Sequence, residues 1–391
     1  MNIKELAGET RELLKTAALA ASARVWRAPL SQPASFERLR RHLVYERPHP
    51  PVALPYQPAA NCGDLAHAAE TRTFVPDCVW ELAVGQADIR SLGVCRAGGL
   101  IINGKWLPDL DFSATAGLLD LPLKPRRQHY PLVVAPWPHL WASFYDYVTF
   151  VVAKLCRIEQ VYGPEIWLRA KVCYPLLHTG FERDFLRKLG IPAENLIDTA
   201  PLWNTALSAD RVIVANSQPS WSSSAGDLAL LRQRFRLPEM AAGAGRRIYL
   251  ERRGRRRVLN EAPVYELLRA HDFEILEDRA YSIDEQIALF QQAGVVVAPH
   301  GAGLTNLLWC EPGTRVLEFF YNGYAPNYYH YLTTALQLDY HFLVDYSAGP
   351  AGNHWTNMSH DMLVDVPALE RQLQRLLVGS PPPERASVAL L

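Results

Sequence analysis

The sequence predicts an α/β protein built from two domains, and three observations lead to this prediction. The chain has 391 residues, which is more than one ordinary core needs. From residue 131 onward, short apolar runs alternate with runs of helical spacing. In the second half the apolar runs are continuous, as in parallel strands that are covered on both faces. We therefore expect two Rossmann-like domains that face each other across a cleft.

Composition and charge narrow the function classes. Hydrophobic residues make up 49% and charged residues 20% of the chain, which is typical of a globular protein. The formal net charge is zero, so charge-driven binding must come from local clusters. None of the six cysteines forms a CxxC pair, and no Cys/His spacing suggests zinc. These features favour a reduced, cytoplasmic protein, with one disulfide among Cys62, Cys78 and Cys95 left open.

The N-terminal region has no signal-peptide pattern, and no stretch of about 18 uncharged apolar residues predicts a membrane span. Residues 1–28 have helical spacing, for which two interpretations remain. They form a helix docked on their own domain, or they make a peripheral contact with the inner face of a membrane. Residues 29–60 are rich in proline and predict irregular chain on a surface. Asn103-Gly104 predicts a hairpin turn.

The predicted domain boundaries follow the change in pattern. They are an N-terminal domain at 1–216, a connection at 217–245, a second domain at 246–379 and a mobile tail at 380–391. In the first domain we expect strands at 132–135, 166–168 and 211–215 and helices at 139–158 and 181–189. In the second we expect strands at 247–251, 273–276, 295–298, 316–320 and 340–344. Helices are expected from 260, from the capping box Ser282–Glu285, at 303–310 and at 327–338.

A glycine-containing loop, His300-Gly301-Ala302-Gly303, directly follows the predicted strand at 295–298 and opens the next helix. Glycine lets the backbone approach a ligand closely, and a helix N-terminus offers unpaired N–H groups. The loop and the following Leu304-Thr305-Asn306 therefore predict a phosphate cradle. A P-loop is excluded, because the chain has no GxxxxGK[ST] sequence.

Five arginines lie between residues 252 and 257, just past the first strand of the second domain. A guanidinium fork fits the oxygens of a diphosphate. We expect Arg252 and Arg253, which are nearest to the strand, to contact phosphate. Arg255 and Arg256 are explained equally well as surface residues.

Three further residues follow the next predicted strand or end it. Glu318 can accept the two hydroxyls of a ribose, or else form an ion pair with an arginine of its own domain. Tyr321 and Tyr324 belong to an aromatic cluster, and we expect them to contact a sugar ring.

These features together resemble glycosyltransferase family 61, and the chain looks like a bacterial polysaccharide-synthesis member. The similarity runs from Arg247 to about Tyr340. It is carried by Tyr249–Arg253, Asn260-Glu261, Glu285–Ile287, Pro299–Asn306, Pro312–Thr314 and Glu318. The family usually has serine where Glu251 stands.

The resemblance is weaker upstream. Trp137-Pro138-His139 opens a helix as the family's aromatic-His motif does, but Ser143 replaces the Asp of that motif. Asp146 lies one turn further along, so that His139, Ser143 and Asp146 share one helix face.

The resemblance implies a GT-B-like fold and an inverting transfer that needs neither metal nor cofactor. The second domain would bind a nucleotide sugar, expected to be UDP-linked, and the N-terminal domain a glycan or glycoconjugate acceptor. The arginines and the glycine loop would stabilise the leaving diphosphate. His139 or Asp146 would act as general base, although His139 is explained equally well as a capping or core residue.

The sequence also contains features that favour other interpretations. Asp109-Leu110-Asp111 spells the DxD of metal-dependent glycosyltransferases, but Pro108 precedes it, and we interpret it as a turn. Because of Ser143, a non-catalytic nucleotide-sugar-binding or scaffold protein of the same fold remains the alternative. Zero net charge disfavours a nucleic-acid binder that uses the arginine run.

Overall fold

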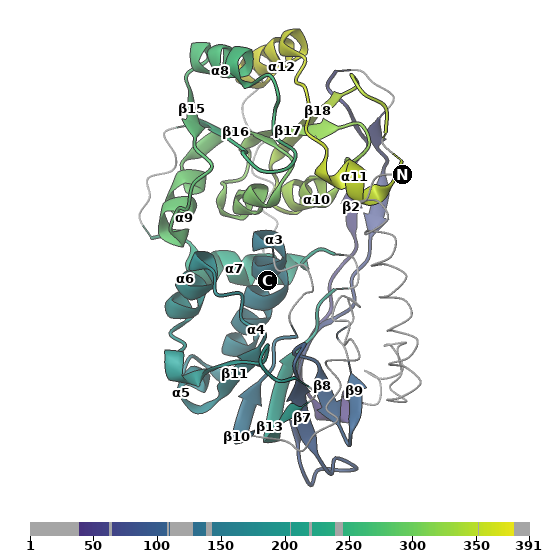
Figure 1. Ribbon diagram of the computed structural model, residues 1–391, viewed down its shortest axis with the longest axis vertical. Helices are drawn as coiled ribbons and strands as arrows, with labels where there is room; N and C mark the ends of the chain where they lie inside the picture. Colours follow the sequence, from purple (N-terminus) through teal and green to yellow (C-terminus); the bar gives the residue numbers. More distant parts are fainter. Residues whose placement is uncertain are drawn as a thin grey trace. The chain divides into compact units, whose positions relative to one another are not determined.

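A computed structural model gives the fold of most of the chain. It describes residues 39–61, 65–107, 109, 128–137, 143–203, 205–218, 221–238, 245–350 and 352–378. The chain divides into two compact units (Figure 1). Unit 1 comprises the described residues of Met1–Pro51 and Thr73–Arg236, and unit 2 those of Val52–Arg72 and Leu237–Leu391.

Unit 2 contains a five-stranded parallel sheet, as predicted. Its strands are β14 (Arg246–Leu250), β15 (Phe273–Leu276), β16 (Ala293–Pro299), β17 (Arg315–Tyr321) and β18 (Asp339–Asp345), in the order β15-β14-β16-β17-β18. After β14 the chain adds β15 on one side and then returns to add β16 on the other. The direction of winding therefore reverses between β14 and β16, which makes this pair the topological switch point of the sheet.

The helices of unit 2 connect these strands. They are α8 (Glu261–Ala270), α9 (Ile283–Gln291), η5 (Ala302–Trp309), α10 (Tyr328–Ala335), α11 (His354–Ser359) and α12 (Val366–Val378), and α8 and α12 pack on each other (Figure 1). The predicted capping box opens α9, because Ser282 and Glu285 exchange backbone and side-chain hydrogen bonds. The helix predicted at 303–310 is a 3-10 helix instead. Three residues per turn align Leu304, Leu307 and Cys310, and all three are buried.

The segment Val52–Arg72, named here the clasp segment, belongs to unit 2 although the sequence assigned it to the N-terminal domain. It forms two short hairpin pairs, β2 (Val52–Leu54) with β5 (Glu70–Arg72) and β3 (Gln57–Pro58) with β4 (Ala66–His67). The Ala60 N–H donates to the carbonyl of Phe342 in β18 at 2.7 Å. The edge strand of the sheet is therefore hydrogen-bonded to the clasp segment.

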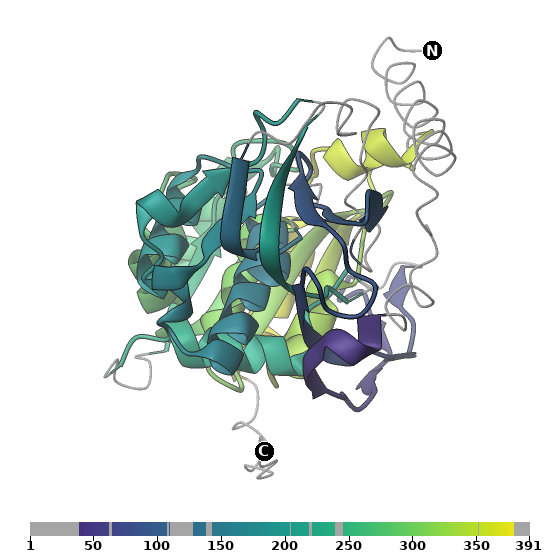
Figure 2. The same cartoon turned by 90° about the horizontal axis from the view of Figure 1, so that it is seen from below.

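Unit 1 has a nine-stranded mixed sheet, which departs from the predicted Rossmann-like domain. One part is parallel and has the order β12 (Leu196–Asp198), β11 (Lys171–Tyr174), β10 (Gln128–Val134), β13 (Ala206–Ala215). The strands β10 and β13 are the blue and teal arrows side by side in Figure 2. The other edge of β13 pairs antiparallel with β7 (Leu92–Cys95) and then with β6 (Asp77–Ala83). The turn-rich N-terminal half of this unit thus completes the sheet that the parallel strands begin.

The remaining strands of unit 1 are antiparallel. β1 (Leu43–Arg47) pairs with β6, and β8 (Leu100–Ile102) joins β7 to β9 (Lys105–Leu107). The hairpin predicted at Asn103-Gly104 is confirmed between β8 and β9, with φ of 51° and 75° at the two turn residues.

The helices of unit 1 agree with the sequence in one place and differ in two. α6 (Gly180–Leu189) ends at left-handed Gly190, as predicted. The strand predicted at 166–168 is wrong, because these residues form the short helix α5 (Ile166–Arg169), whereas the strand is β11. The helix α7 (Ala225–Phe235) lies in the stretch predicted as a connection. The long helical run comprises α3 (Phe144–Asp146), a π-helical turn η3 (Tyr147–Val152) and α4 (Ala153–Tyr162).

Two chemical features of the described residues bear on the class of protein. The five cysteines among them, Cys78 and Cys95 included, are free and buried. No helix within the described ranges is both long and apolar enough to cross a membrane.

Candidate functional site

Two loops of unit 2 leave the sheet at its switch point. The arginine loop follows β14, and the glycine loop follows β16, its hydrogen-bonded parallel neighbour. Both loops therefore lie at the carboxyl ends of adjacent strands, where open α/β sheets bind their ligands. The sequence predicted the two loops separately, and the strand order brings them together.

Gly301 packs directly against the guanidinium group of Arg252. A Cβ atom at Gly301 would lie 1.7 Å from Nη1 of Arg252, so any side chain here would displace this guanidinium group. The backbone of Gly301 is extended, with φ of 174°, so close approach and not backbone strain requires glycine here. At Gly303 a Cβ would meet only Leu250 Cδ1 at 3.6 Å, an ordinary contact.

Arg256 is the second arginine of the site, although the sequence did not favour it. Its backbone is left-handed, with φ of 63°, and the residue is only 8% exposed. Its Cζ lies 5.7 Å from the ring centroid of Tyr324, and its Nε atom is buried without a hydrogen-bond partner. No spacing rule marks this residue. The signal is the turn itself, which directs one arginine of the run inward.

Arg253 behaves in the opposite way. Its side chain is 65% exposed, and its Nε donates to the carboxylate of Glu251 at 3.0 Å. Arg252 and Arg256 are therefore the partly or fully buried arginines of the loop, whereas Arg253 is exposed, and its contact with phosphate stays a prediction. Glu251, which departs from the usual serine of the resembled family, also accepts the backbone N–H of Asp278.

The two inward arginines carry positive charge that no carboxylate neutralises. Among the described residues neither Arg252 nor Arg256 lies within ion-pair distance of an Asp or Glu. Burial, with the repulsion of Arg256, lowers the pKa of Arg252 to about 10, and burial also lowers the pKa of Arg256. Both side chains stay charged at neutral pH. Removing a charge from water without a counter-ion costs free energy, so the arrangement favours binding of an anion.

His300 lies beside the arginines and is held on several sides. It is 4% exposed, and its backbone N–H donates to the Phe319 carbonyl at 2.9 Å. Its imidazole ring stacks on the ring of Phe320, with centroids 5.2 Å apart. Its Nδ1 lies 2.5 Å from Oε1 of Glu318. Burial and the two arginines lower the pKa of His300 well below its ordinary value, so the imidazole is neutral.

Glu318 supports His300 and is closed to a ligand in this structure. Its side chain is fully buried, and its second oxygen accepts a hydrogen bond from the Tyr340 hydroxyl at 2.7 Å. Burial raises the pKa of Glu318 well above its ordinary value. In the structure Glu318 thus contacts His300 and Tyr340 rather than an arginine of its domain, and its contact with ribose stays a prediction.

The rest of the glycine loop divides into an open part and a packed part. The first 3-10 hydrogen bond runs from the Leu304 N–H to the Gly301 carbonyl at 3.0 Å, so the N–H groups of Ala302 and Gly303 precede it. Leu304, Thr305 and Asn306 are buried.

Asn306 is used inside the protein. Its amide donates to Gln286 of α9 at 2.8 Å, and its oxygen accepts from Trp309 at 3.1 Å. The side chain of Asn306 thus ties η5 to α9, which differs from the ligand contact that the sequence predicted.

The two predicted sugar-contact tyrosines have different positions. Tyr324 packs edge-on against His300, with ring centroids 5.5 Å apart, and covers Arg256. Tyr321 is 2% exposed, lies in β17 and stacks on His360 at 4.0 Å. Tyr324 therefore lies beside His300 and Arg256, whereas the ring of Tyr321 is packed in the core, and contact of either tyrosine with a sugar stays a prediction.

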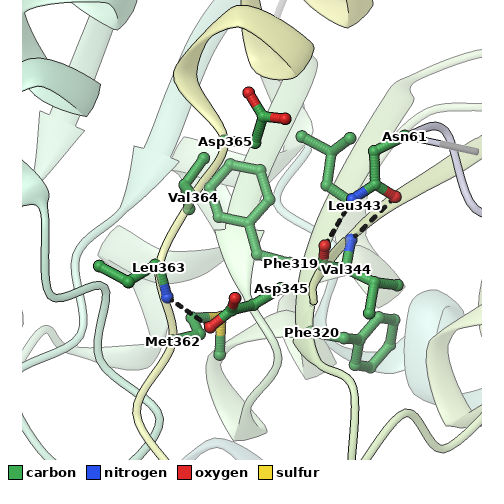
Figure 3. Close-up of a pocket in the computed structure, with 10 residues that line it drawn as sticks. All are labelled: Asn61, Phe319, Phe320, Leu343, Val344, Asp345, Met362, Leu363, Val364 and Asp365. Carbon is green, nitrogen blue, oxygen red and sulfur yellow. Dashed lines mark hydrogen bonds between the residues drawn. The ribbon is translucent and has the colours of Figure 1, made fainter. Parts of the chain in front are cut away.

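A small pocket lies beside the ends of β17 and β18, and Figure 3 shows hydrogen bonds made by two of its polar side chains, those of Asn61 and Asp345. Asn61 of the clasp segment is hydrogen-bonded to both backbone groups of Val344. The carboxylate of Asp345 accepts from the backbone N–H groups of Leu363 and Ser347. The pocket contains none of the arginine or glycine-loop residues, and we do not assign the chemistry to it.

The predicted base residues belong to unit 1. Asp146 is 7% exposed and forms a capping box with Ser143, whose Oγ lies 2.5 Å from the Asp146 carboxylate. Burial raises the pKa of Asp146 to about 6. Ser143 and Asp146 are therefore brought together as predicted, whereas His139 lies outside the described residues.

Asp109, the described residue of the DxD sequence, makes its contacts inside the protein. The Asp109 carboxylate accepts from Lys154 Nζ at 2.6 Å and from the Ser217 N–H at 2.9 Å, and it is 1% exposed. Leu110 and Asp111 lie outside the described residues. Across the part of the chain that the structure covers, no cluster of three His, Cys, Asp or Glu side chains is arranged to hold a metal ion.

Comparison with known proteins identifies the family of the chain. The family Glycosyltransferase 61 matches residues 101–317, which is more than half of the chain. A beta-1,2-xylosyltransferase of rice, Oryza sativa subsp. japonica, is 37% identical over 60 residues, or 15% of this chain. That match spans only 11% of the rice protein. The chain therefore belongs to glycosyltransferase family 61, whose class is that of the sugar-transferring enzymes (EC 2.4). The match includes the arginine and glycine loops and ends one residue before Glu318.

Proposed function

We propose that unit 2 binds the diphosphate of a nucleotide sugar at the switch point between β14 and β16. The observation that carries this proposal is the pair Arg252 and Arg256, two inward guanidinium groups with no carboxylate partner in the described structure, one of them packed on Gly301. Two such forks and the N–H groups of Ala302 and Gly303 match the oxygens of a diphosphate. We expect the nucleotide to be uridine diphosphate.

The reaction that these groups serve best is transfer of the sugar to a hydroxyl of a glycan or glycoconjugate. Departure of the nucleoside diphosphate develops negative charge on its terminal phosphate. Preorganised guanidinium and N–H groups stabilise that charge without a divalent metal ion. We infer direct displacement at the anomeric carbon, with inversion of configuration.

The His300–Glu318 pair adds one orienting hydrogen bond. The Glu318 carboxyl group lies 2.5 Å from Nδ1 of His300 and fixes the orientation of the ring. The contact leaves Nε2 of the imidazole for the sugar nucleotide. Tyr340 holds the other oxygen of Glu318 and fixes this arrangement.

The acceptor and the base are assigned to unit 1 in this proposal, as in a GT-B arrangement. His139 and Asp146 remain the predicted base residues. The pKa of about 6 at Asp146 suits a carboxyl that must take a proton from an acceptor hydroxyl near neutral pH. A double comparison of His139→Ala and Asp146→Asn in a transfer assay tests this part, and full turnover in both variants removes both residues from the mechanism.

The proposal is tested by assaying donor hydrolysis and transfer with a panel of nucleotide sugars in the presence of EDTA. The wild type should turn over one donor, whereas Arg252→Ala/Arg256→Ala should lose turnover. Arg255→Ala is the matched control, because Arg255 is an exposed arginine of the same loop. Nucleotide binding without turnover of any donor would favour the non-catalytic alternative, and activity only after addition of a divalent ion would contradict the metal-independent mechanism.

A further inference from the structure

We propose that the carboxyl edge of β11 and β12 in unit 1 carries a subsite for a neutral sugar of the acceptor, formed by His178, Asp198, Trp203 and Arg96. This inference rests on the proposed function, since it names the part of unit 1 that recognises the carbohydrate. The four side chains lie in three loops, and hydrogen bonds connect these loops to one another.

The first part of the subsite is a pair of polar side chains. His178 Nε2 lies 3.1 Å from Oδ2 of Asp198, and the imidazole is 70% exposed. The other oxygen of Asp198 accepts the backbone N–H groups of Leu176 and Ala200, at 3.1 and 2.9 Å. Asp198 is therefore fixed by the loops after β11 and β12, and His178 keeps Nδ1 toward solvent for a ligand.

The backbone around His178 is held in an unusual conformation. His178 has φ of 56°, in the left-handed region that residues other than glycine rarely adopt. The buried carboxylate of Glu182 accepts the N–H groups of Leu177 and His178, at 3.0 and 2.7 Å. A hydrogen bond from Tyr174 to the same carboxylate, at 2.9 Å, anchors it to the end of β11. A buried carboxylate thus holds the backbone of an exposed histidine in this conformation. A backbone held in such a rarely populated conformation is typical of functional loops.

The second part is an exposed aromatic platform. Trp203 is 52% exposed, and the guanidinium carbon of Arg96 lies 3.9 Å from its ring centroid. Arg96 in turn donates from Nε to the carbonyl of Ala200 at 2.7 Å, the residue whose N–H binds Asp198. One face of the indole is covered by the guanidinium and the indole remains more than half exposed. Ala200 joins this platform to the His178–Asp198 pair.

This combination fits a carbohydrate better than other ligands. The C–H face of a pyranose stacks on an indole, while its hydroxyls both donate and accept hydrogen bonds. A carboxylate and an imidazole offer an acceptor and a donor side by side, which suits the hydroxyls of a sugar. His178 and Asp198 also lie at the carboxyl ends of the parallel neighbours β11 and β12, where α/β sheets bind ligands, whereas Arg96 follows the antiparallel strand β7. The parallel neighbour of β11 is β10, which His139 follows in the sequence.

The test is saturation-transfer NMR of the full-length protein with a panel of neutral oligosaccharides, xylo- and chito-oligosaccharides included, followed by titration of those that bind. Trp203→Ala and His178→Asn should each weaken oligosaccharide binding about tenfold, as expected for loss of an aromatic stack or a polar contact. Asparagine tolerates the left-handed backbone and keeps the fold. Leu168→Ala, at an exposed apolar residue of the same unit, is the control and should change nothing.

The outcomes separate this inference from the proposed function. Uridine diphosphate should bind equally to the wild type, Trp203→Ala and His178→Asn, because its site lies in unit 2. In a transfer assay the KM for the acceptor should rise in both variants, while the KM for the donor stays unchanged. If no oligosaccharide of the panel binds, or if both variants bind as the wild type does, the subsite is contradicted even though nucleotide binding persists. Sugar binding that depends on Trp203 without nucleotide binding would contradict the proposed function instead and leave the subsite supported.

Discussion

At the scale of single residues, the structure differs from the prediction in which arginines of the loop are buried. Position in the run favoured Arg252 and Arg253 over Arg256. Distance from the strand end was the criterion, and it carries no information on which way each side chain points. The left-handed turn at Arg256 directs this guanidinium to Tyr324, while Glu251 holds Arg253 outside. A positive φ at a non-glycine residue is not readable from one sequence.

Replacing Arg256 should weaken ligand binding and leave the empty protein at least as stable. Arg256→Ala removes a buried guanidinium that has no carboxylate partner, so the desolvation cost disappears with it. The affinity for uridine diphosphate should fall between about tenfold and a hundredfold, as charge-assisted hydrogen bonds are lost. Calorimetric titration and thermal unfolding of the ligand-free variant check both parts. A strongly destabilised variant with unchanged affinity would show that Arg256 is structural.

The two glycines of the loop should differ in their tolerance of alanine. Gly301→Ala forces the guanidinium of Arg252 away, because Nη1 lies 1.7 Å from the new methyl position. The displaced atoms belong to the end of a flexible side chain, so nucleotide affinity should fall by about tenfold or more with little loss of stability. Gly303→Ala meets one ordinary contact at 3.6 Å and should bind nearly as the wild type does. Equal affinities of the two variants, measured by the same titration, would contradict the packing of Arg252 on Gly301.

At the scale of elements, the buried strands were predictable and the short apolar run was not. β16 and β17 are continuous apolar runs bounded by turns, and such runs in a β-α alternation specify parallel strands. Ile166-Trp167-Leu168 looks equally apolar but forms the single helical turn α5, since three residues are too few to show a period. The helix after the glycine loop lies where the sequence predicted it. Its 3-10 form depends on packing, which the spacing of apolar residues does not specify.

The clasp segment gives a pH-dependent prediction. His67 in β4 is 6% exposed and stacks on His330 and Phe342, with centroids 5.3 and 4.5 Å away. Burial, and then repulsion from His330, lower the pKa of His67 from 6.5 to about 4. The folded-state pKa lies below that of the unfolded chain, so the unfolded chain binds more protons in this range. The contribution of neutral His67 to the free energy of unfolding is therefore complete above pH 6.5. It falls as the pH drops toward 4, by up to about 3 kcal/mol.

Hydrogen exchange of the clasp segment at pH 7 and pH 5, corrected for the intrinsic pH dependence of exchange, checks this prediction. Protection of Val52–Arg72 should decrease at the lower pH. His67→Phe keeps the aromatic packing but removes the titrating group, so its protection should depend less on pH. If the variant and the wild type lose protection equally, another group is responsible.

At the scale of the whole molecule, the sequence predicted an α/β chain, and two features escaped it. The clasp segment is separated by 283 residues from the strand whose backbone it binds through Asn61, and contacts at such separation leave no local pattern. The antiparallel part of the unit 1 sheet joins turn-rich strands to the parallel strand β13, so this unit is not a plain Rossmann-like domain. The GT-B-like arrangement of the two units stays a prediction.

The position of the donor site follows from the strand order more than from any motif. The arginine loop and the glycine loop are almost 50 residues apart in the sequence, and each alone is a weak signal. The order β15-β14-β16 places them at the ends of neighbouring strands. The residue types are readable in the sequence, whereas the topology places them where one ligand could contact both loops.

The most direct test of the central claim is a crystal structure of the full chain with uridine diphosphate and no divalent metal. The account predicts diphosphate density between Arg252 and Arg256, with oxygens within hydrogen-bond distance of both guanidinium groups and of the Ala302 and Gly303 N–H groups. Density at any other place in unit 2, such as the pocket in Figure 3, with both arginines left without an anion, would contradict it.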